Sequence, residues 1–377
     1  MTINKEFIFP NEPTRFSGDN FEPVLSYCTN IKASDITLQT DEPITVEIHG
    51  HLYKITNHHL STTEVGDVLN SIYGPNGTTQ LLSGQDVDTH YEFHPNRNER
   101  YRYRVNATSC QVEGRTGIQL TLRTIPIDPP LLKDLDVPSA IIDAAKPLDG
   151  AVYVTGATGS GKSTLLAAII RDIVEDPNCN RKVLTYESPI EFVFDAVVKP
   201  TAIVSQSEIP RHLASFAAGV RNALRRKPRL IMVGESRDTE TIEAVIEAAL
   251  TGHPVYTTLH TTGVPETVRR LVNSFTAEER DGRTIDIIET LRLIVCQKLV
   301  PTVDGKQVAL REFLKFGEEE RDFLLQSDLT QITAITRQLL NKQGQPMKVD
   351  AKQKFDAGII SKRDYDLIVT AEASKKD

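Results

Sequence analysis

A glycine-rich stretch in the middle of the chain carries the residue types that bind phosphate. It reads Gly156-Ala157-Thr158-Gly159-Ser160-Gly161-Lys162-Ser163, fits the pattern G-x-x-x-x-G-K-[ST], and is followed by Thr164. Glycines let backbone N–H groups turn inward around phosphate oxygens, and a helix that begins there adds the positive end of its dipole. In this pattern Lys162 reaches the β- and γ-phosphates, and the Ser163 hydroxyl ligates Mg²⁺. Residues 156–164 therefore predict a nucleotide site, with ATP and Mg²⁺ as the cofactors.

Three glutamates follow strand-like segments and could act on a bound nucleotide. Hydrolysis needs a group that positions the attacking water. Glu235 follows the apolar run Leu230–Val233, and a carboxylate at the carboxyl edge of a sheet faces the same crevice as the phosphate loop. Glu187 and Glu191 come at and after the end of the run Lys182–Tyr186. We expect them near the metal or the water, with capping of the turn as the alternative.

Two histidines and several arginines are further candidates. His253 and His260 bracket the run Pro254–Leu259, which predicts a hydrogen bond near the γ-phosphate, or else a core or capping role. The basic run 221–229 is more typical of a solvated face or a subunit interface than of nucleic-acid binding. Arg102, Arg104, Arg115 and Arg123 lie far upstream of the phosphate loop, and an arginine that meets a transferring phosphate often comes from another domain or chain.

The elements that must position these residues change character along the chain. Up to about residue 123 the pattern predicts an α+β region with a helix at Ser61–Ile72. Its strands are expected at Asp35–Leu38, Ile44–His49, His90–Phe93, Tyr101–Ala107 and Gly117–Arg123. The stretch Thr124–Ala140 carries four prolines and is the predicted linker.

Beyond the linker, strands alternate with helices. Strands are expected at Ala151–Thr155, Lys182–Tyr186, Leu230–Val233 and Val255–Leu259, with a helix at Lys162–Val174. This alternation predicts a mainly parallel sheet covered by helices. After Gln307–Phe316 the rest reads as helical. The predicted regions are therefore 1–123, 124–140, 141–316 and 317–377.

Composition is typical of a globular protein of two domains. The 377 residues are 39% hydrophobic and 25% charged, with 43 Lys and Arg against 51 Asp and Glu, a net charge of −8. That balance argues against broad adhesion to nucleic acid. The longest apolar run, Leu165–Ile170, is too short to span a membrane, and Met1–Phe16 shows no signal peptide. The four cysteines are widely spaced, so a reduced, cytoplasmic protein is expected.

Several motifs together resemble one family. The chain resembles the PilT-like type II/IV secretion-system ATPases in six segments. They are RYRVN and RTIP upstream, followed by GATGSGKST, LTYESPIEF, RLIMVGESRD and TGHPVYTTLHTT. Within that superfamily the resemblance is greatest to the ATPases of type IVB secretion and plasmid conjugation. It runs from about Ala33 to about Ser361.

The resemblance implies a PAS-like N-terminal domain and a RecA-like ATPase domain, with helices at the C-terminus. It implies a homo-hexameric ring at the cytoplasmic face of the inner membrane, in contact with secretion-complex components and without membrane insertion or direct nucleic-acid binding. By the same resemblance, Glu235 is the Walker B glutamate, Glu187–Glu191 the acidic box, and Thr251–His260 the His box. Arg102, Arg104 and Arg123 match arginines that reach a nucleotide, commonly across a subunit interface.

Three departures from the family pattern concern the acidic residues and the C-terminal region, and the third of them narrows the expected function. The acidic box reads Glu187-Ser188-Pro189 rather than E-D-P, and Arg229 replaces the usual acid before the Walker B strand. The A-I-R motif linked to pilus retraction has no counterpart near Phe323–Leu329. The sequence therefore favours an ATPase of a secretion or conjugation apparatus. A pilus retraction motor, a RecA-like nucleic-acid motor and a nucleotide-gated scaffold are the alternatives.

Overall fold

The structure is a computed structural model that describes residues 7–97, 99–125 and 127–373. The start of the predicted N-terminal region, one proline of the predicted linker and the end of the polar tail therefore lie outside the described residues. The chain divides into two units. The N-terminal unit comprises residues 1–127 and 189–192, and the C-terminal unit comprises residues 128–188 and 193–377.

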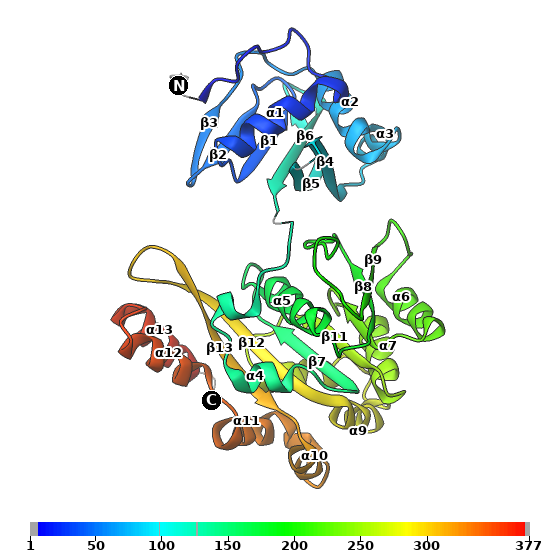
Figure 1. Ribbon diagram of the computed structural model, residues 1–377, viewed down its shortest axis with the longest axis vertical. Coiled ribbons are helices and arrows are strands. Elements are labelled where there is room, and N and C mark those ends of the chain that lie inside the picture. The colour runs from blue at the N-terminus through cyan, green and yellow to red at the C-terminus, as the bar shows by residue number, and fades with distance from the viewer. Residues whose placement is uncertain (1–6, 98, 126, 374–377) are drawn as a thin grey trace. The chain divides into compact units, whose positions relative to one another are not determined.

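The N-terminal unit is a six-stranded antiparallel sheet with helices on one face (Figure 1). The sheet order is β3-β2-β1-β6-β5-β4. The strands are β1 (Asp35–Gln39), β2 (Thr45–Ile48), β3 (His51–Lys54), β4 (Val87–Asn96), β5 (Glu99–Val112) and β6 (Arg115–Thr124), and the helices are α1 (Gly18–Asn30), α2 (Thr62–Tyr73) and α3 (Gly77–Leu82). Along β5, Tyr103, Val105 and Ala107 are buried while Arg104 and Asn106 are exposed. One face of the sheet thus packs in the core and the other is polar, which confirms the α+β prediction.

The predicted strand Ile44–His49 is one half of a hairpin. His49 and Gly50 take positive φ values of 51° and 80°, and this two-residue turn starts β3. Turns of this kind match the right-handed twist of the two strands that they join. The sequence prediction missed β3 because a histidine in the left-handed region carries little signal.

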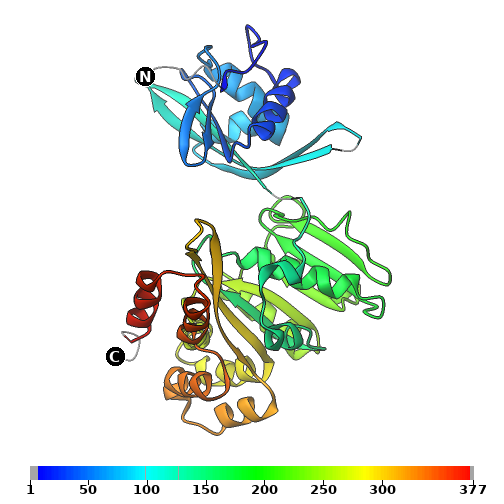
Figure 2. The ribbon, with the colours of Figure 1, turned by 60° about the vertical axis from the view of Figure 1, so that its left-hand side comes forward.

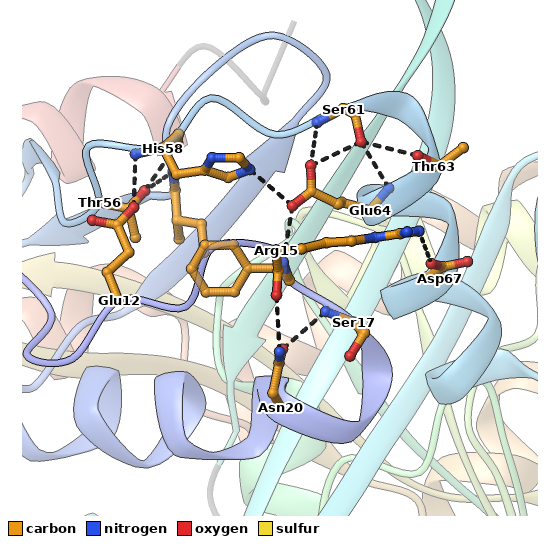
Figure 3. Close-up of polar contacts among 12 residues, drawn as sticks. Glu12, Arg15, Ser17, Asn20, Thr56, His58, Ser61, Thr63, Glu64 and Asp67 are labelled. Carbon is orange, nitrogen blue, oxygen red and sulfur yellow. Dashed lines mark hydrogen bonds and ion pairs between the residues drawn. The ribbon is translucent and has the colours of Figure 1, made fainter.

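Helix α2 begins in a dense polar cluster (Figure 3). Glu64, 4% exposed, accepts hydrogen bonds from the Phe16 and Ser61 backbone N–H groups and from the Ser61 hydroxyl, and its carboxylate lies 2.8 Å from His58 Nε2. Burial raises the pKa of the Glu64 carboxyl, but these hydrogen bonds outweigh burial and hold the pKa below its ordinary value. The capping box therefore also joins α2 to the segment before α1.

The C-terminal unit is a seven-stranded sheet between layers of helices (Figure 1). Its strands are β7 (Gly150–Thr155), β8 (Lys182–Glu187), β9 (Ile203–Glu208), β10 (Leu230–Val233), β11 (Pro254–Leu259), β12 (Leu291–Pro301) and β13 (Gln307–Lys315). Its helices are α4 (Ser139–Ala144), α5 (Lys162–Glu175), α6 (Phe216–Ala223), α7 (Thr239–Leu250), α8 (Val264–Val272), α9 (Arg280–Thr290), α10 (Glu318–Leu325), α11 (Ile332–Gln343), α12 (Met347–Asp356) and α13 (Lys362–Ala373), with a 3₁₀ helix η2 at Leu132–Leu135.

The sheet order β13-β12-β7-β11-β10-β8-β9 leaves the β12–β13 pair as the only antiparallel pair among the described strands of this sheet. This confirms the predicted mainly parallel sheet and the α/β class. Residues on one sheet face, including Tyr153 and Val233, share a core with α6 to α11, whereas α5 covers the opposite face. Figure 2 shows the long β12–β13 hairpin at the sheet edge.

Three strands of this sheet, β9, β12 and β13, were not among the predicted strands. The polar edge strand β9 shows only partial burial. β12 contains the apolar run Leu293–Cys296 and begins directly after helix α9, where the sequence pattern does not mark a boundary. No described helix meets the length and hydrophobicity needed to cross a bilayer.

Candidate nucleotide site

The phosphate loop connects β7 to α5. Gly156 has a φ of 141° and Gly161, the N-cap of α5, a φ of 81°, so both occupy backbone conformations that side chains disfavour. A Cβ at Gly156 would lie 2.2 Å from the backbone oxygen of Gln297. The loop therefore requires glycine at these positions both for its conformation and for its close approach to β12.

Lys162 lies inside the loop that precedes it. Its Nζ donates hydrogen bonds to the carbonyl oxygens of Gly156 and Ala157, both at 2.9 Å, and the residue is 8% exposed. Ser163 and Thr164 follow in the first turn of α5, where the positive end of the helix dipole lies. A strand, a glycine-rich loop and a helix thus follow one another, and this is the structural context that the motif requires.

The parallel strands bring several predicted residues to one edge of the sheet. Gly156 follows β7, Glu187 ends β8, Glu235 comes two residues after β10, and His260 follows β11. Because neighbouring strands run in the same direction, their carboxyl ends share this edge. Adjacent strands lie ~4.8 Å apart, so these groups follow one another along the same edge of the sheet.

Glu235 stands on a backbone that is fixed from both neighbouring strands. The N–H of Gly234 donates to Tyr186 O at 2.7 Å, and the Thr258 hydroxyl donates to Gly234 O at 2.6 Å. On its other side, the N–H of Ser236 donates to Thr258 O at 3.0 Å. These bonds hold the residue in place.

Two side chains hold the carboxylate of Glu235 itself. Arg237 Nε donates to Oε2 at 2.8 Å, and His260 Nε2 lies 3.2 Å from Oε1. The Glu235 side chain is 21% exposed, so it remains accessible to water. The structure therefore brings His260 and Glu235 together, as expected if both act on one substrate.

His253 lies at the opposite edge. It precedes β11, and its Nδ1 lies 3.2 Å from the carbonyl oxygen of Ala248 in α7 and 3.1 Å from the Thr251 hydroxyl. β11 is six residues long, so at ~3.3 Å per residue about 20 Å of strand separates the two histidines. The structure does not bring His253 to the phosphate loop. The basic run 221–229 ends where β10 begins, also away from that loop.

A second acid that the sequence analysis did not single out accompanies Glu187. Glu187 accepts from the Thr185 hydroxyl at 2.6 Å and from Gln206 Nε2 at 3.0 Å. Glu208, at the end of β9, is its register partner, and both residues are buried. The sequence analysis did not single out Glu208, because the strand that it ends is only partly buried and shows no clear hydrophobic pattern. Glu191 belongs to the N-terminal unit, where its carbonyl oxygen accepts a hydrogen bond from Arg102.

The three predicted arginines share the polar face of the N-terminal sheet. Arg104 on β5 and Arg123 on β6 are direct register partners, and each pairs with an aspartate on a neighbouring strand, Asp88 and Asp35 respectively. Arg102, 1% exposed, donates to the carbonyl oxygens of Ile190 and Glu191, both at 2.8 Å. Arg104 and Arg123 keep exposed surface, whereas Arg102 is enclosed within its unit.

A family model described as "Type II/IV secretion system protein" matches residues 134–354. The crystal structure of the Legionella pneumophila ATPase DotB is 64% identical with a TM-score of 0.92, over 97% of this chain and 99% of that chain.

Pilus motors are also similar to this chain. The type IV pilus retraction ATPase PilT of Pseudomonas aeruginosa is 32% identical over 77% of this chain and 81% of its own length. A crystal structure of the pilus retraction motor PilT with bound ADP is 28% identical with a TM-score of 0.78, over 92% of this chain and 95% of that chain. With its phosphate loop at the carboxyl edge of a parallel sheet, the chain is a P-loop ATPase and belongs to the type II/IV secretion-system family.

Proposed function

We propose that this protein is a cytoplasmic, Mg²⁺-dependent, hexameric ATPase that drives a type IVB-like secretion or conjugative transfer apparatus by nucleotide-driven domain motion. The observation that supports the hydrolytic step best is the arrangement of the phosphate loop and the Glu235–His260 pair at one edge of one sheet. The likeness to DotB supports the assignment to a secretion apparatus.

In the proposed reaction, the loop amides and Lys162 hold the β- and γ-phosphates. Phosphate oxygens accept stronger, charge-assisted bonds than carbonyls do, so the Lys162 ammonium exchanges its two loop carbonyls for phosphate. Glu235 then accepts a proton from the water that attacks the γ-phosphorus, and the bond to the β–γ bridging oxygen breaks. His260 and Arg237 keep the Glu235 carboxylate in one orientation.

The residues fit a magnesium ion that is held mostly by the nucleotide. Among the described residues no group of three or more His, Cys, Asp or Glu side chains is arranged to hold a metal ion. Magnesium in nucleotide sites usually keeps several waters and takes few protein ligands besides the phosphates. Ser163 would supply the one hydroxyl, and the ion neutralises phosphate charge when bound.

The exposed arginines support the hexamer. Arg104 and Arg123 lie side by side, and each is paired with an aspartate that a more highly charged phosphate group can replace. We propose that they reach a nucleotide of a neighbouring subunit, where positive charge stabilises the transferring phosphate.

The test is ATP turnover per protomer across a wide dilution series, with the mass of the assembly measured on the same samples. We expect turnover per protomer to rise steeply with concentration, together with formation of the ring. Constant turnover by a monomer would contradict sites completed by a neighbour. No turnover at any concentration would favour a scaffold that binds nucleotide without consuming it.

A pilus retraction motor is the second candidate, because the PilT relatives cover most of the chain. Complementation separates the two functions. Expression in a strain that lacks its retraction ATPase should not restore twitching, whereas expression in a strain that lacks its type IVB ATPase should restore secretion. A nucleic-acid motor would show ATPase activity strongly stimulated by DNA and sensitive to salt.

A further inference from the structure

Strand register places Gln297 of β12 directly beside the phosphate loop. Cys296 pairs with Thr155, the last residue of β7, so Gln297 comes level with the first glycine of the loop. On the other side of β12, Gln297 pairs with Arg311 of β13. Both residues are nearly inaccessible, with Gln297 3% exposed and Arg311 2%. Two strand pairings thus place a buried amide between the loop and a buried guanidinium.

The chemistry of its neighbours fixes the orientation of the Gln297 amide. Arg311 can only donate, so its Nε bonds to Gln297 Oε1, at 2.9 Å. The amide nitrogen therefore faces the loop, where it donates to the carbonyl oxygen of Ser160 at 2.6 Å. A Cβ at Gly161 would lie 2.8 Å from this nitrogen, so the loop packs closely on it.

Arg311 extends the chain of contacts to the start of the C-terminal unit. Its two terminal nitrogens donate to the carbonyl oxygens of Asp136 and Leu135, at 2.7 and 2.9 Å. These residues end the 3₁₀ helix η2, which packs against α5. Arg171 of α5 donates to the carbonyl oxygen of Pro129, a second tie to the same segment.

Helix α12 provides the counter-charges. Lys354 Nζ donates to Asp136 Oδ2 at 2.8 Å and lies 3.6 Å from Asp350 Oδ1. The Asp350 carboxylate also accepts from the backbone N–H of Arg311 at 2.7 Å. Burial lowers the pKa of the Arg311 guanidinium, and the charges of Asp350 and Asp136 oppose that shift. Because a guanidinium stays protonated in proteins, the arginine keeps all its donors.

We propose that Gln297 and Arg311 are positioning residues, which tie the conformation of the phosphate loop to residues 131–136 and to helix α12. The inference rests on nucleotide binding at the loop, as proposed above. A nucleotide that orders the loop fixes the Ser160 carbonyl, and the same bonds then hold the segment that follows the linker. By reciprocity, displacement of that segment weakens nucleotide binding.

The experiment is hydrogen exchange, read by mass spectrometry, on the full-length protein with and without saturating ADP. In the wild type we expect ADP to slow exchange at residues 156–164 and also at 131–136 and 347–356. In Gln297→Leu, ADP should still protect the loop, but protection of the two distant segments should be lost. ADP affinity should fall by about tenfold, the effect of one lost hydrogen bond.

A conservative variant and a matched control complete the design. Gln297→Glu keeps the acceptor for Arg311 but places a carboxylate against the Ser160 carbonyl, so its ADP affinity should recover relative to wild type as pH falls and the carboxyl gains a proton. Arg292→Gln removes an arginine of β12 that also donates to two backbone carbonyls, at the other end of the strand. It should retain the full ADP response.

The outcomes separate the two proposals. If the wild type binds no ADP, the proposed function fails and the inference fails with it. If ADP protects the loop but leaves 131–136 and 347–356 unchanged, only the inference fails. It also fails if Gln297→Leu transmits protection as the wild type does.

Discussion

Glu235 combines a fixed backbone with a carboxylate held by two side chains. Glu235→Gln keeps the shape but removes the base, so we expect ATP binding to persist while turnover falls by at least ~100-fold. Nucleotide-binding titrations and phosphate release on the same preparation check this. Unchanged turnover would show that another group activates the water.

His260 and His253 lie at opposite ends of β11, so substituting each in turn tests which end of the strand acts on the nucleotide. His260→Ala removes the imidazole beside Glu235, and we expect turnover to fall by about tenfold or more with a small change in ATP affinity. His253→Ala alters the opposite edge of the sheet and should leave turnover nearly unchanged. Steady-state kinetics of the two variants, side by side, check the assignment. Equal losses would contradict it.

Pattern analysis of the sequence reached most of this site because each residue follows a recognisable strand. It proposed Lys162 from the glycine-rich phosphate-loop pattern, and Glu187, Glu235 and His260 from apolar runs that end in polar residues. The histidine pattern could not tell which end of β11 faces the nucleotide. Gln297 and Arg311 were out of reach for another reason, since their meeting depends on the register of three strands and no local motif records it.

Helix α2 depends on an ionised carboxylate at its first turn. Because the pKa of Glu64 is held below its ordinary value, its stabilisation is complete above the ordinary carboxyl pKa of ~4.3 and is lost as pH falls through the lower, folded-state value. Glu64→Gln places a neutral amide against N–H donors. We therefore expect this substitution to lower the stability of the folded state by about 2 kcal/mol at neutral pH.

Hydrogen-exchange protection of α2 measures this effect. The difference between wild type and Glu64→Gln should shrink in acid, as the wild type loses its charge. Glu42→Gln is the control, because Glu42 is about half exposed and forms only a surface ion pair with Lys54. A pH-independent difference would mean that the charge of Glu64 contributes nothing.

The two units are expected to move against each other during turnover, about the predicted linker 124–140. The structure shortens that segment, because residues 128–188 belong to the C-terminal unit and Arg311 anchors the end of η2 there. The proposed hinge is therefore the short stretch between Thr124, which ends β6, and Asp128.

Inserting six Gly and Ser residues after Ile127 tests whether this hinge transmits force. A longer flexible linker transmits motion poorly, so we expect secretion to be lost while ADP binding is kept. The control is the same insertion after Gly305, in the exposed turn between β12 and β13. Cells that carry this control variant should secrete normally. Normal secretion by the hinge insertion would contradict nucleotide-driven domain motion as the power stroke.

The N-terminal unit is discontinuous in the chain, and this limits how it can be separated. Residues 189–192 lie between β8 and β9 in sequence, yet they supply the two carbonyl oxygens that accept from the buried Arg102. A fragment cut after Ile127 would leave that guanidinium without these acceptors. A chimera that exchanges this unit between relatives would therefore have to transfer the short 189–192 segment together with the first 127 residues.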